Sequence, residues 1–259
     1  MTTARTTPHT AHLVAALSLL IFGLLTTLTL PHTTNAQVIP DDPGNFITTW
    51  DTENPGTSND DQITIPHANG STYNYDIYWE NTASSTMTGT TTVTGSDAAS
   101  SPTITFPEPG IYEVQASGTF PHILFDNGKD GDKLLTVEQW GDIEWASMRG
   151  AFRGCSNLMI PAMDAPDLSN VTSLRQMFNN ASTFNSEINH WDVSNVTDYN
   201  FMFKGAGSFN QPLSNWDTAS ATTMYQMFKS AINFNQNINS WDVSNVETDG
   251  LIAMFADAS

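Results

Sequence analysis

The stretch FNSEINHWDVSNVTDYNFMFKGAGS, residues 184–208, is followed directly by FNQPLSNWDTASATTMYQMFKSAIN, residues 209–233. Phe-Asn, Trp-Asp and Met-Phe pairs occupy the same places in both stretches, so each pair recurs after 25 residues. The same pairs occur on either side, at Phe234-Asn235, Trp241-Asp242, Met177-Phe178 and Met254-Phe255, the last of which is displaced by two residues. Three markers in one register indicate a true internal repeat.

Each copy has two halves with different apolar spacing. The first half follows the L-x-x-L-x-L-x-x spacing of leucine-rich repeats and predicts a short strand; its positions are Ile238, Trp241, Val243 and Val246. The second half has the i, i+3, i+4, i+7 spacing of a brief helix or helical turn; its positions are Met224, Met227, Phe228 and Ala231. One copy cannot bury its apolar side alone. Stacking is therefore expected, with Trp191, Trp216 and Trp241 as successive rungs of one interior.

The segment before the repeat is different. Short β-prone runs alternate there with turns rich in Gly, Pro, Asn and Asp, which predicts a small antiparallel sandwich. The runs are 46–50, 62–67, 73–79, 90–93, 102–106 and 111–117. The expected fold class is mainly β with short helices, in which a leucine-rich-type solenoid follows a β-sandwich. The expected boundaries are a sandwich at 37–125, a linker at 126–136 and repeats at 137–259, which begin with a cap at 137–152 and comprise about four turns.

The N-terminus has the features of an export signal. Arg5 is the only charged residue before Asp41, and the apolar run 13–30 ends shortly before the small residues of Thr34-Asn35-Ala36. This pattern predicts a signal peptide over residues 1–36, cleaved before Gln37, and an extracellular or cell-surface protein with no membrane insertion after cleavage. The alternative is a retained membrane anchor, because the apolar run approaches the length of a spanning helix.

Charge and cysteine content exclude some classes of function. Eight Lys and Arg residues stand against 27 Asp and Glu residues, and the formal net charge is −19. Such a surface repels phosphate backbones, so nucleic acid is not an expected partner. The single cysteine, Cys155, permits no disulfide within the chain. It aligns with Ala181, Ala206, Ala231 and Ala258 in the repeat, which predicts a small buried packing residue.

The predicted strands suggest a candidate binding face. If Trp and Val point inward, the residues between them point outward. This places two rows on the face: Asp167, Asp192, Asp217 and Asp242, and beside them Ser169, Ser194 and Ser244. The rows could bind a ligand or Ca²⁺. The alternative is that each Asp caps backbone amides in a local turn. Asn185, Asn210 and Asn235 are expected to form a structural ladder of amides between copies.

The other polar features of the sequence give little indication of a metal or catalytic site. The loop 126–132 faintly resembles a calcium loop but lacks an oxygen ligand at its third position and Glu at its twelfth, so a polar connection is expected. No cofactor is predicted, and Ca²⁺ is the only ion that the acidic rows suggest. The sequence has no nucleophile elbow, zinc-protease motif, phosphate loop or dinucleotide fingerprint. Three histidines after the signal, His67, His122 and His190, lie far apart.

The repeats resemble the BspA-like leucine-rich repeat surface proteins. The resemblance covers roughly residues 130–259 and is carried by 209–217, by 241–246, by the Met-Phe pairs, and by 154–158 with 164–171 as an entry repeat. Upstream, 105–114 is similar to the final strand region of a PKD-like or immunoglobulin-like module, although 78–82 departs from that family's usual turn. The resemblance implies display at a cell surface, adhesion to host or neighbouring-cell components, and no catalysis.

Three functions follow as expectations. The first is an adhesin-like scaffold for host-matrix or cell-surface proteins or glycans, because repetition multiplies weak contacts. The second is a structural spacer with no defined ligand. The third is a secreted glycan-active enzyme, which would need paired carboxylates in a cleft, whereas the acids here are periodic. Because 255–258 reach the second half of a copy and the chain then stops, a truncated frame or self-association through that end is also expected.

Overall fold

The computed structural model of the protein describes residues 39–126 and 128–258, which fall within one compact unit, Asn35–Ser259. The predicted signal peptide, residues 1–36, lies outside the described residues. In the described part of the chain, no helix has the length and apolar character needed to cross a membrane.

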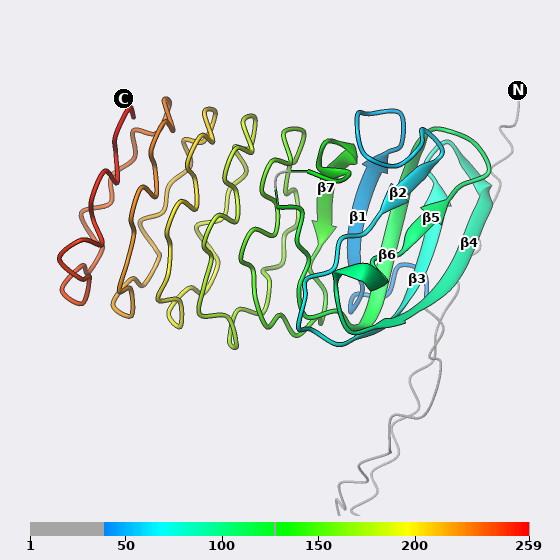
Figure 1. Ribbon diagram of the computed structural model, residues 1–259, viewed down its shortest axis with the longest axis horizontal. Coiled ribbons are helices and arrows are strands. Elements are labelled where there is room, and N and C mark those ends of the chain that lie inside the picture. The colour runs from blue at the N-terminus through cyan, green and yellow to red at the C-terminus, as the bar shows by residue number, and fades with distance from the viewer. Residues whose placement is uncertain (1–38, 127, 259) are drawn as a thin grey trace, which may run out of the picture. The chain divides into compact units, whose positions relative to one another are not determined.

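The first part of the unit consists of two antiparallel sheets (Figure 1). The larger sheet has the order β4-β3-β6-β1-β7, and β2 pairs with β5 in the smaller one. The strands are β1 (Phe46–Asp51), β2 (Gln62–Thr64), β3 (Tyr73–Asn81), β4 (Ser84–Gly95), β5 (Thr103–Thr105), β6 (Ile111–Thr119) and β7 (Leu134–Gln139). Each β-prone run expected from the sequence overlaps one of β1–β6, so the mainly-β prediction is confirmed.

Alternation along the strands places an aromatic core behind the large sheet. In β3 every second residue is buried, from Tyr73 to Asn81, as expected for a strand with one face toward the core. Trp79 meets Phe106 and Tyr112 edge-on at 5.1 and 5.7 Å between ring centroids, and Phe106 stacks on Tyr112 at 3.9 Å. Because Phe106 follows β5 and Tyr112 lies in β6, these rings join the small sheet to the large one.

A buried histidine lies in this core. The ring of His67 stacks on that of Tyr73, with 3.6 Å between centroids. Its Nδ1 lies 3.0 Å from Ser100 Oγ and its Nε2 lies 2.9 Å from Tyr75 Oη. Burial, and then the nearby charge of Lys129, lowers the pKa of His67 from 6.5 to about 4. The fold therefore holds this imidazole in its neutral form.

Acid is therefore expected to weaken the fold through His67. The folded pKa lies below the unfolded value, so the stabilisation is complete above pH 6.5 and is lost as the pH falls from 6.5 towards 4. The free energy of unfolding should drop by about 3 kcal/mol over that window. Urea titrations at several pH values measure it. A His67→Gln variant should lose most of this dependence, and His190→Gln, at an exposed site, should keep it; equal slopes in all three proteins would contradict the assignment.

Strand β7 connects the sheet to the repeats. On one side it pairs with β1, with Thr48 opposite Val137. On the other side Thr136 forms a parallel bridge with Met159, and the Val137 backbone N–H donates to the Met159 carbonyl at 3.0 Å. Residues 134–136, which the sequence assigns to a linker, are thus part of a strand. The hydrophobic core runs without a break from the sheets into the repeats.

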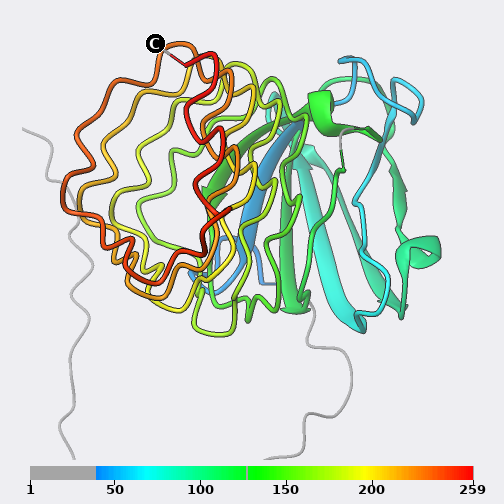
Figure 2. The ribbon, with the colours of Figure 1, turned by 60° about the vertical axis from the view of Figure 1, so that its left-hand side comes forward.

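The repeats lie side by side and are joined by backbone hydrogen bonds (Figures 1 and 2). In the Met-Phe half of a copy, alternate N–H groups donate to carbonyls of the next copy. Examples are Leu174 to Asp198 at 2.9 Å, Gln176 to Asn200 at 2.9 Å and Phe178 to Met202 at 2.9 Å. The short strand expected around each Trp-Asp pair is not formed. Regular pairing in the copies is confined, among the described residues, to isolated bridges, such as Ser173 with Asp198 and Asp198 with Thr223.

The helix expected in the second half of each copy is not formed either. Met224, Met227, Phe228 and Ala231 are buried as predicted, but they lie in a run of turns. Gln226 and Ser230 adopt left-handed backbone angles, with φ of 53° and 59°, which a right-handed helix cannot contain. Helix is nearly absent from the described residues, which hold two short 3-10 segments, Ala98–Ser100 and Gly131–Lys133.

Aromatic columns fill the interior of the repeats. Phe178, Phe203, Phe228 and Phe255 stack in sequence, with 5.6, 5.4 and 5.5 Å between successive centroids. Trp216 and Trp241 stack at 6.3 Å, as expected for adjacent rungs. Trp191 is also buried but departs from this arrangement, because its ring meets Trp140 edge-on at 5.4 Å. The cap residue Trp140 therefore takes part in the same interior.

Cys155 occupies the alanine position of the repeat. Its N–H donates to the Phe152 carbonyl at 3.1 Å, as that of Ala181 does to Phe178 at 3.1 Å. The side chain is fully buried, and burial raises the pKa of its thiol. The predicted packing role is confirmed.

Candidate binding face

The row of aspartates lies on exposed turns. Each carboxylate accepts a hydrogen bond from the backbone N–H two residues later, the geometry of an Asx turn. The pairs are Asp167 with Ser169 at 2.9 Å, Asp192 with Ser194 at 3.0 Å, Asp217 with Ala219 at 3.0 Å and Asp242 with Ser244 at 2.8 Å. All four aspartates are exposed. They cap local backbone amides, as the alternative interpretation expected, and still face the solvent.

Neighbouring serines strengthen the charge of this row. Ser194 Oγ donates to Asp192 Oδ1 at 2.7 Å. Hydroxyl bonds of this kind, followed by the backbone N–H bonds, lower the pKa of Asp167, Asp192 and Asp242. These carboxylates therefore remain charged well into the acid range.

Bonds between copies hold these turns in a row. Asn195 Nδ2 donates to the Ser169 carbonyl at 3.2 Å, and Asn245 Nδ2 donates to the Ala219 carbonyl at 2.8 Å. Thr218, which is buried, donates its hydroxyl to the Asp242 carbonyl at 3.0 Å. Successive copies thus present the same acidic turn in the same place.

A second set of bonds joins the asparagines after each Phe. Asn185 Oδ1 accepts from the Asn210 N–H at 2.8 Å, and Asn210 Oδ1 accepts from the Asn235 N–H at 2.9 Å. These amides form the ladder between copies at the surface rather than in the interior, since Asn185 and Asn235 are exposed.

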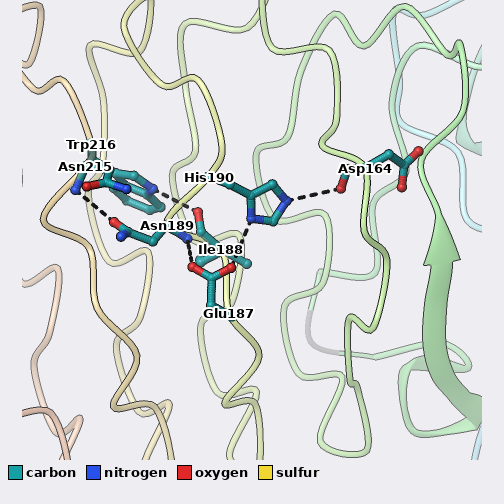
Figure 3. A network of polar contacts seen from close by, with 7 residues as sticks. All are labelled: Asp164, Glu187, Ile188, Asn189, His190, Asn215 and Trp216. Carbon is teal, nitrogen blue, oxygen red and sulfur yellow. Dashed lines mark hydrogen bonds and ion pairs between the residues drawn. The ribbon is translucent and has the colours of Figure 1, made fainter.

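His190 lies in a network that spans three copies (Figure 3). Its Nδ1 lies 3.1 Å from Glu187 Oε2 and its Nε2 lies 3.2 Å from the Asp164 carbonyl oxygen. Glu187 also accepts from the Asn189 N–H at 2.7 Å, and Asn189 Oδ1 accepts from the Asn215 N–H at 2.8 Å. This network ties neighbouring copies together. His67 and His122 are buried elsewhere, so the structure does not bring the histidines into one site.

The three aspartates of the acidic loop before the repeats all have partners within the protein. Asp126 pairs with Arg153 at 2.5 Å, and Asp132 accepts from Ser156. Asp130 is buried and accepts from the N–H groups of Thr57, Ser58 and Thr64 at 2.7, 3.0 and 2.6 Å. Burial opposes its ionisation, but these bonds outweigh burial and lower its pKa. In the described part of the chain, no three His, Cys, Asp or Glu side chains gather to hold a metal ion.

Sequence reasoning missed two sets of basic residues. Lys133 is fully buried, and its ammonium group contacts oxygens of Ser58, Asn59 and Gln62 at 2.6–3.3 Å. A lone Lys beside a turn gives no signal of this role. The other set lies in the Met-Phe segments 148–154, 174–180, 199–205 and 224–230, where the sequence does carry a signal, because these four hold bases and no acids.

Residues 146–259 match the model of a family described as a Mycoplasma protein of unknown function, DUF285. The match falls on the repeats that resemble BspA-like surface proteins and is consistent with that resemblance. No curated protein and no solved structure matches the chain.

Proposed function

We propose that the protein is a secreted or cell-surface binding scaffold without catalytic activity, in which the region matched by the DUF285 family presents a repeated face to host-matrix or cell-surface proteins or glycans. In this proposal residues 137–259 form a leucine-rich-type solenoid after a PKD-like sandwich. The observation that carries the proposal is the repetition of one exposed Asx turn at Asp167, Asp192, Asp217 and Asp242.

Repetition favours binding over catalysis. Each turn offers the same carboxylate in the same setting, so one ligand can meet several weak contacts at once, and the contacts add as avidity. The long stack keeps the turns in register without a change of shape on binding, which reduces the entropic cost of association. Export by the predicted signal peptide would place this face outside the cell.

The Asp192→Asn and Asp217→Asn double variant should weaken binding at least about tenfold, since it removes two adjacent charges from the face. Asn keeps the oxygen that accepts the turn N–H, so the fold should be retained. Binding of the purified chain to immobilised matrix proteins and glycans measures the effect, and circular dichroism checks folding. Glu108→Gln, an exposed acidic site before the repeats, is the matched control. Unchanged binding in a folded double variant would remove the face from the proposal.

A structural spacer is the second candidate. The bonds between copies, such as Asn185 to Asn210 and Asn210 to Asn235, favour it because they stabilise the stack rather than leave groups for a ligand. A spacer would show no saturable binding to any component tested.

A further inference from the structure

The basic residues of this acidic chain gather in one part of the repeats. Five of the eight Lys and Arg residues lie in the Met-Phe segments 148–154, 174–180, 199–205 and 224–230, and none of these segments contains Asp or Glu. We call the five residues the basic strip: Arg149, Arg153, Arg175, Lys204 and Lys229. All of them are exposed or half-buried. The corresponding segment of the last copy, 251–257, differs, because it holds Asp257 and no base.

The hydrogen bonds between copies bring these segments side by side. The Gly150 N–H donates to the Arg175 carbonyl, the Asn180 N–H to that of Lys204, and the Gly205 N–H to that of Lys229, each at 2.8 Å. Phe178 and Phe203, one copy apart beneath the strip, are 5.6 Å apart between centroids. The basic residues occupy two positions of these adjacent segments: Arg149 and Arg175 directly precede the left-handed residue of their copies, and Arg153, Lys204 and Lys229 lie three residues after it.

An aromatic ring positions two of these cations. Arg175 Cζ lies 5.0 Å and Lys204 Nζ lies 5.3 Å from the centroid of the Phe201 ring. The Tyr225 ring meets Phe201 edge-on at 5.2 Å. A ring attracts a cation through its quadrupole and leaves the charge in place, whereas a carboxylate would neutralise it. Among the described residues of the strip, Arg153 alone forms an ion pair, with Asp126.

The backbone at Phe201 has the left-handed conformation that other copies also have at this position. Its φ is 59°, and the corresponding residues of other copies, Gly150, Gln176 and Gln226, have φ of 62°, 60° and 53°. The fold imposes a left-handed residue here, which Gly tolerates and a bulky side chain disfavours. Residues other than Gly also adopt it in the other copies, so the angle belongs to the repeat and not to Phe201 alone. What distinguishes Phe201 is its ring, which lies against both Arg175 and Lys204.

We propose that the basic strip binds an acidic polysaccharide, through carboxylate or sulfate groups spaced along the polymer. The proposal rests on the proposed binding function and names a ligand class and a surface distinct from the aspartate row. Arg and Lys suit these anions through charge-assisted bonds. The half-buried amides of Gln176 and Gln226 beside them can meet sugar hydroxyls.

The surrounding charge restricts where this ligand can lie. Asp198 flanks the strip, but its carboxylate accepts bonds from Ser173 Oγ at 3.2 Å and from the Asn200 N–H at 2.9 Å. The remaining acidic surface repels a polyanion, so contact is confined to the strip and should weaken as salt screens it. A flexible single chain fits a narrow row better than a wide duplex does.

Titration of the purified full chain with heparin and with polygalacturonate tests the proposal, and neutral dextran is the control polymer. One or both acidic polymers should bind saturably at low salt. Polygalacturonate carries carboxylate groups but no sulfate, so comparing it with heparin shows whether the strip requires sulfate. The Arg175→Gln and Lys204→Gln double variant should lose at least about tenfold in affinity, since each charge-assisted bond is worth about that much. Lys129→Gln removes a base outside the strip and should change little.

Phe201 is tested as a positioning residue. Phe201→Gln takes the residue that neighbouring copies carry at this site, so it should fold, and it should weaken binding several-fold; Phe201→Tyr should restore it. If the neutral double variant unfolds, Arg175→Lys with Lys204→Arg keeps the charge and should bind. The proposal that the basic strip binds an acidic polysaccharide is overturned if neither polymer binds, or if the double variant binds as well as the natural chain. Equal binding to polyglutamate overturns the choice of a polysaccharide. If the chain binds matrix proteins but neither polymer, the proposed scaffold function holds and the proposed role of the basic strip is wrong.

Discussion

The Lys133→Met variant should lose about 1–3 kcal/mol of stability, the cost of leaving buried hydrogen-bonding groups without partners. The Lys133 side chain is fully buried, and its ammonium group contacts the carbonyls of Ser58, Asn59 and Gln62 at 3.3, 2.6 and 3.0 Å. Methionine fills similar volume but donates nothing, so these carbonyls would remain buried without partners. The loop 58–62 would lose its anchor to the segment before β7.

Lys129→Met is the matched control for this prediction. Lys129 lies four residues earlier, is half-buried, and donates to one carbonyl, that of Leu124 at 3.1 Å. Burial lowers the pKa of its ammonium group. Its loss should cost less than about 1 kcal/mol. Urea unfolding followed by tryptophan fluorescence compares the two variants. Equal losses of stability would show that the hydrogen bonds from Lys133 to the 58–62 loop add no more stability than the single bond of Lys129.

Phe203→Ala should destabilise the repeats by about 3–5 kcal/mol through the cavity it leaves. The ring is fully buried and stacks on Phe209 at 4.1 Å, on Phe178 at 5.6 Å and on Phe228 at 5.4 Å. Three rings would lose contacts at once, and backbone bonds on both sides of the copy limit any collapse into the space. The midpoint of thermal unfolding should fall accordingly.

Phe255→Ala tests the same column of stacked Phe rings at a position that is less buried. Phe255 also stacks on Phe228, at 5.5 Å, but its side chain is 46% exposed. The truncation removes less buried surface and opens no closed cavity, so the loss should be about 1 kcal/mol. If the two variants unfolded at the same temperature, the column would not be the source of the stability of the repeats.

Periodicity allowed much of this structure to be predicted. The 25-residue spacing predicted most of the buried residues, because stacked copies hide the positions that recur as Trp, Phe, Met and Ala. In the last copy the prediction is wrong for Val243 and Phe255, which are 43% and 46% exposed. Cys155 was assigned to the alanine position on register alone, and its burial confirms the assignment. The β-prone runs upstream were predicted because alternation and turn residues agree there.

Local conformation within a copy could not be predicted by the same means. Met224, Met227, Phe228 and Ala231 fit a helical face, but two consecutive turns with left-handed residues at Gln226 and Ser230 bury the same positions. The difference lies in where the backbone N–H groups point, towards the next copy rather than along a helix, and no side-chain pattern records that. The aspartates were placed on a strand for the same reason, whereas their own side chains stabilise turns. The cage around Lys133 depends on a contact across some 75 residues.

The constant spacing of the hydrogen bonds between copies determines how this half of the molecule can change length. In the Met-Phe segments, donors meet acceptors about 25 positions further on, as Gln176 meets Asn200. At the segment before them, donors meet acceptors 25 positions back, as Thr222 meets Thr197. Gain or loss of a whole unit preserves every such pairing, while a small insertion inside a Met-Phe segment would offset all those that follow. The two extra residues before Met254 fall at a corner instead, where a turn from Glu247 to Gly250 absorbs them and Met224 still reaches the Gly250 carbonyl at 2.8 Å. Lineages of such chains should therefore differ by entire modules and by small corner loops.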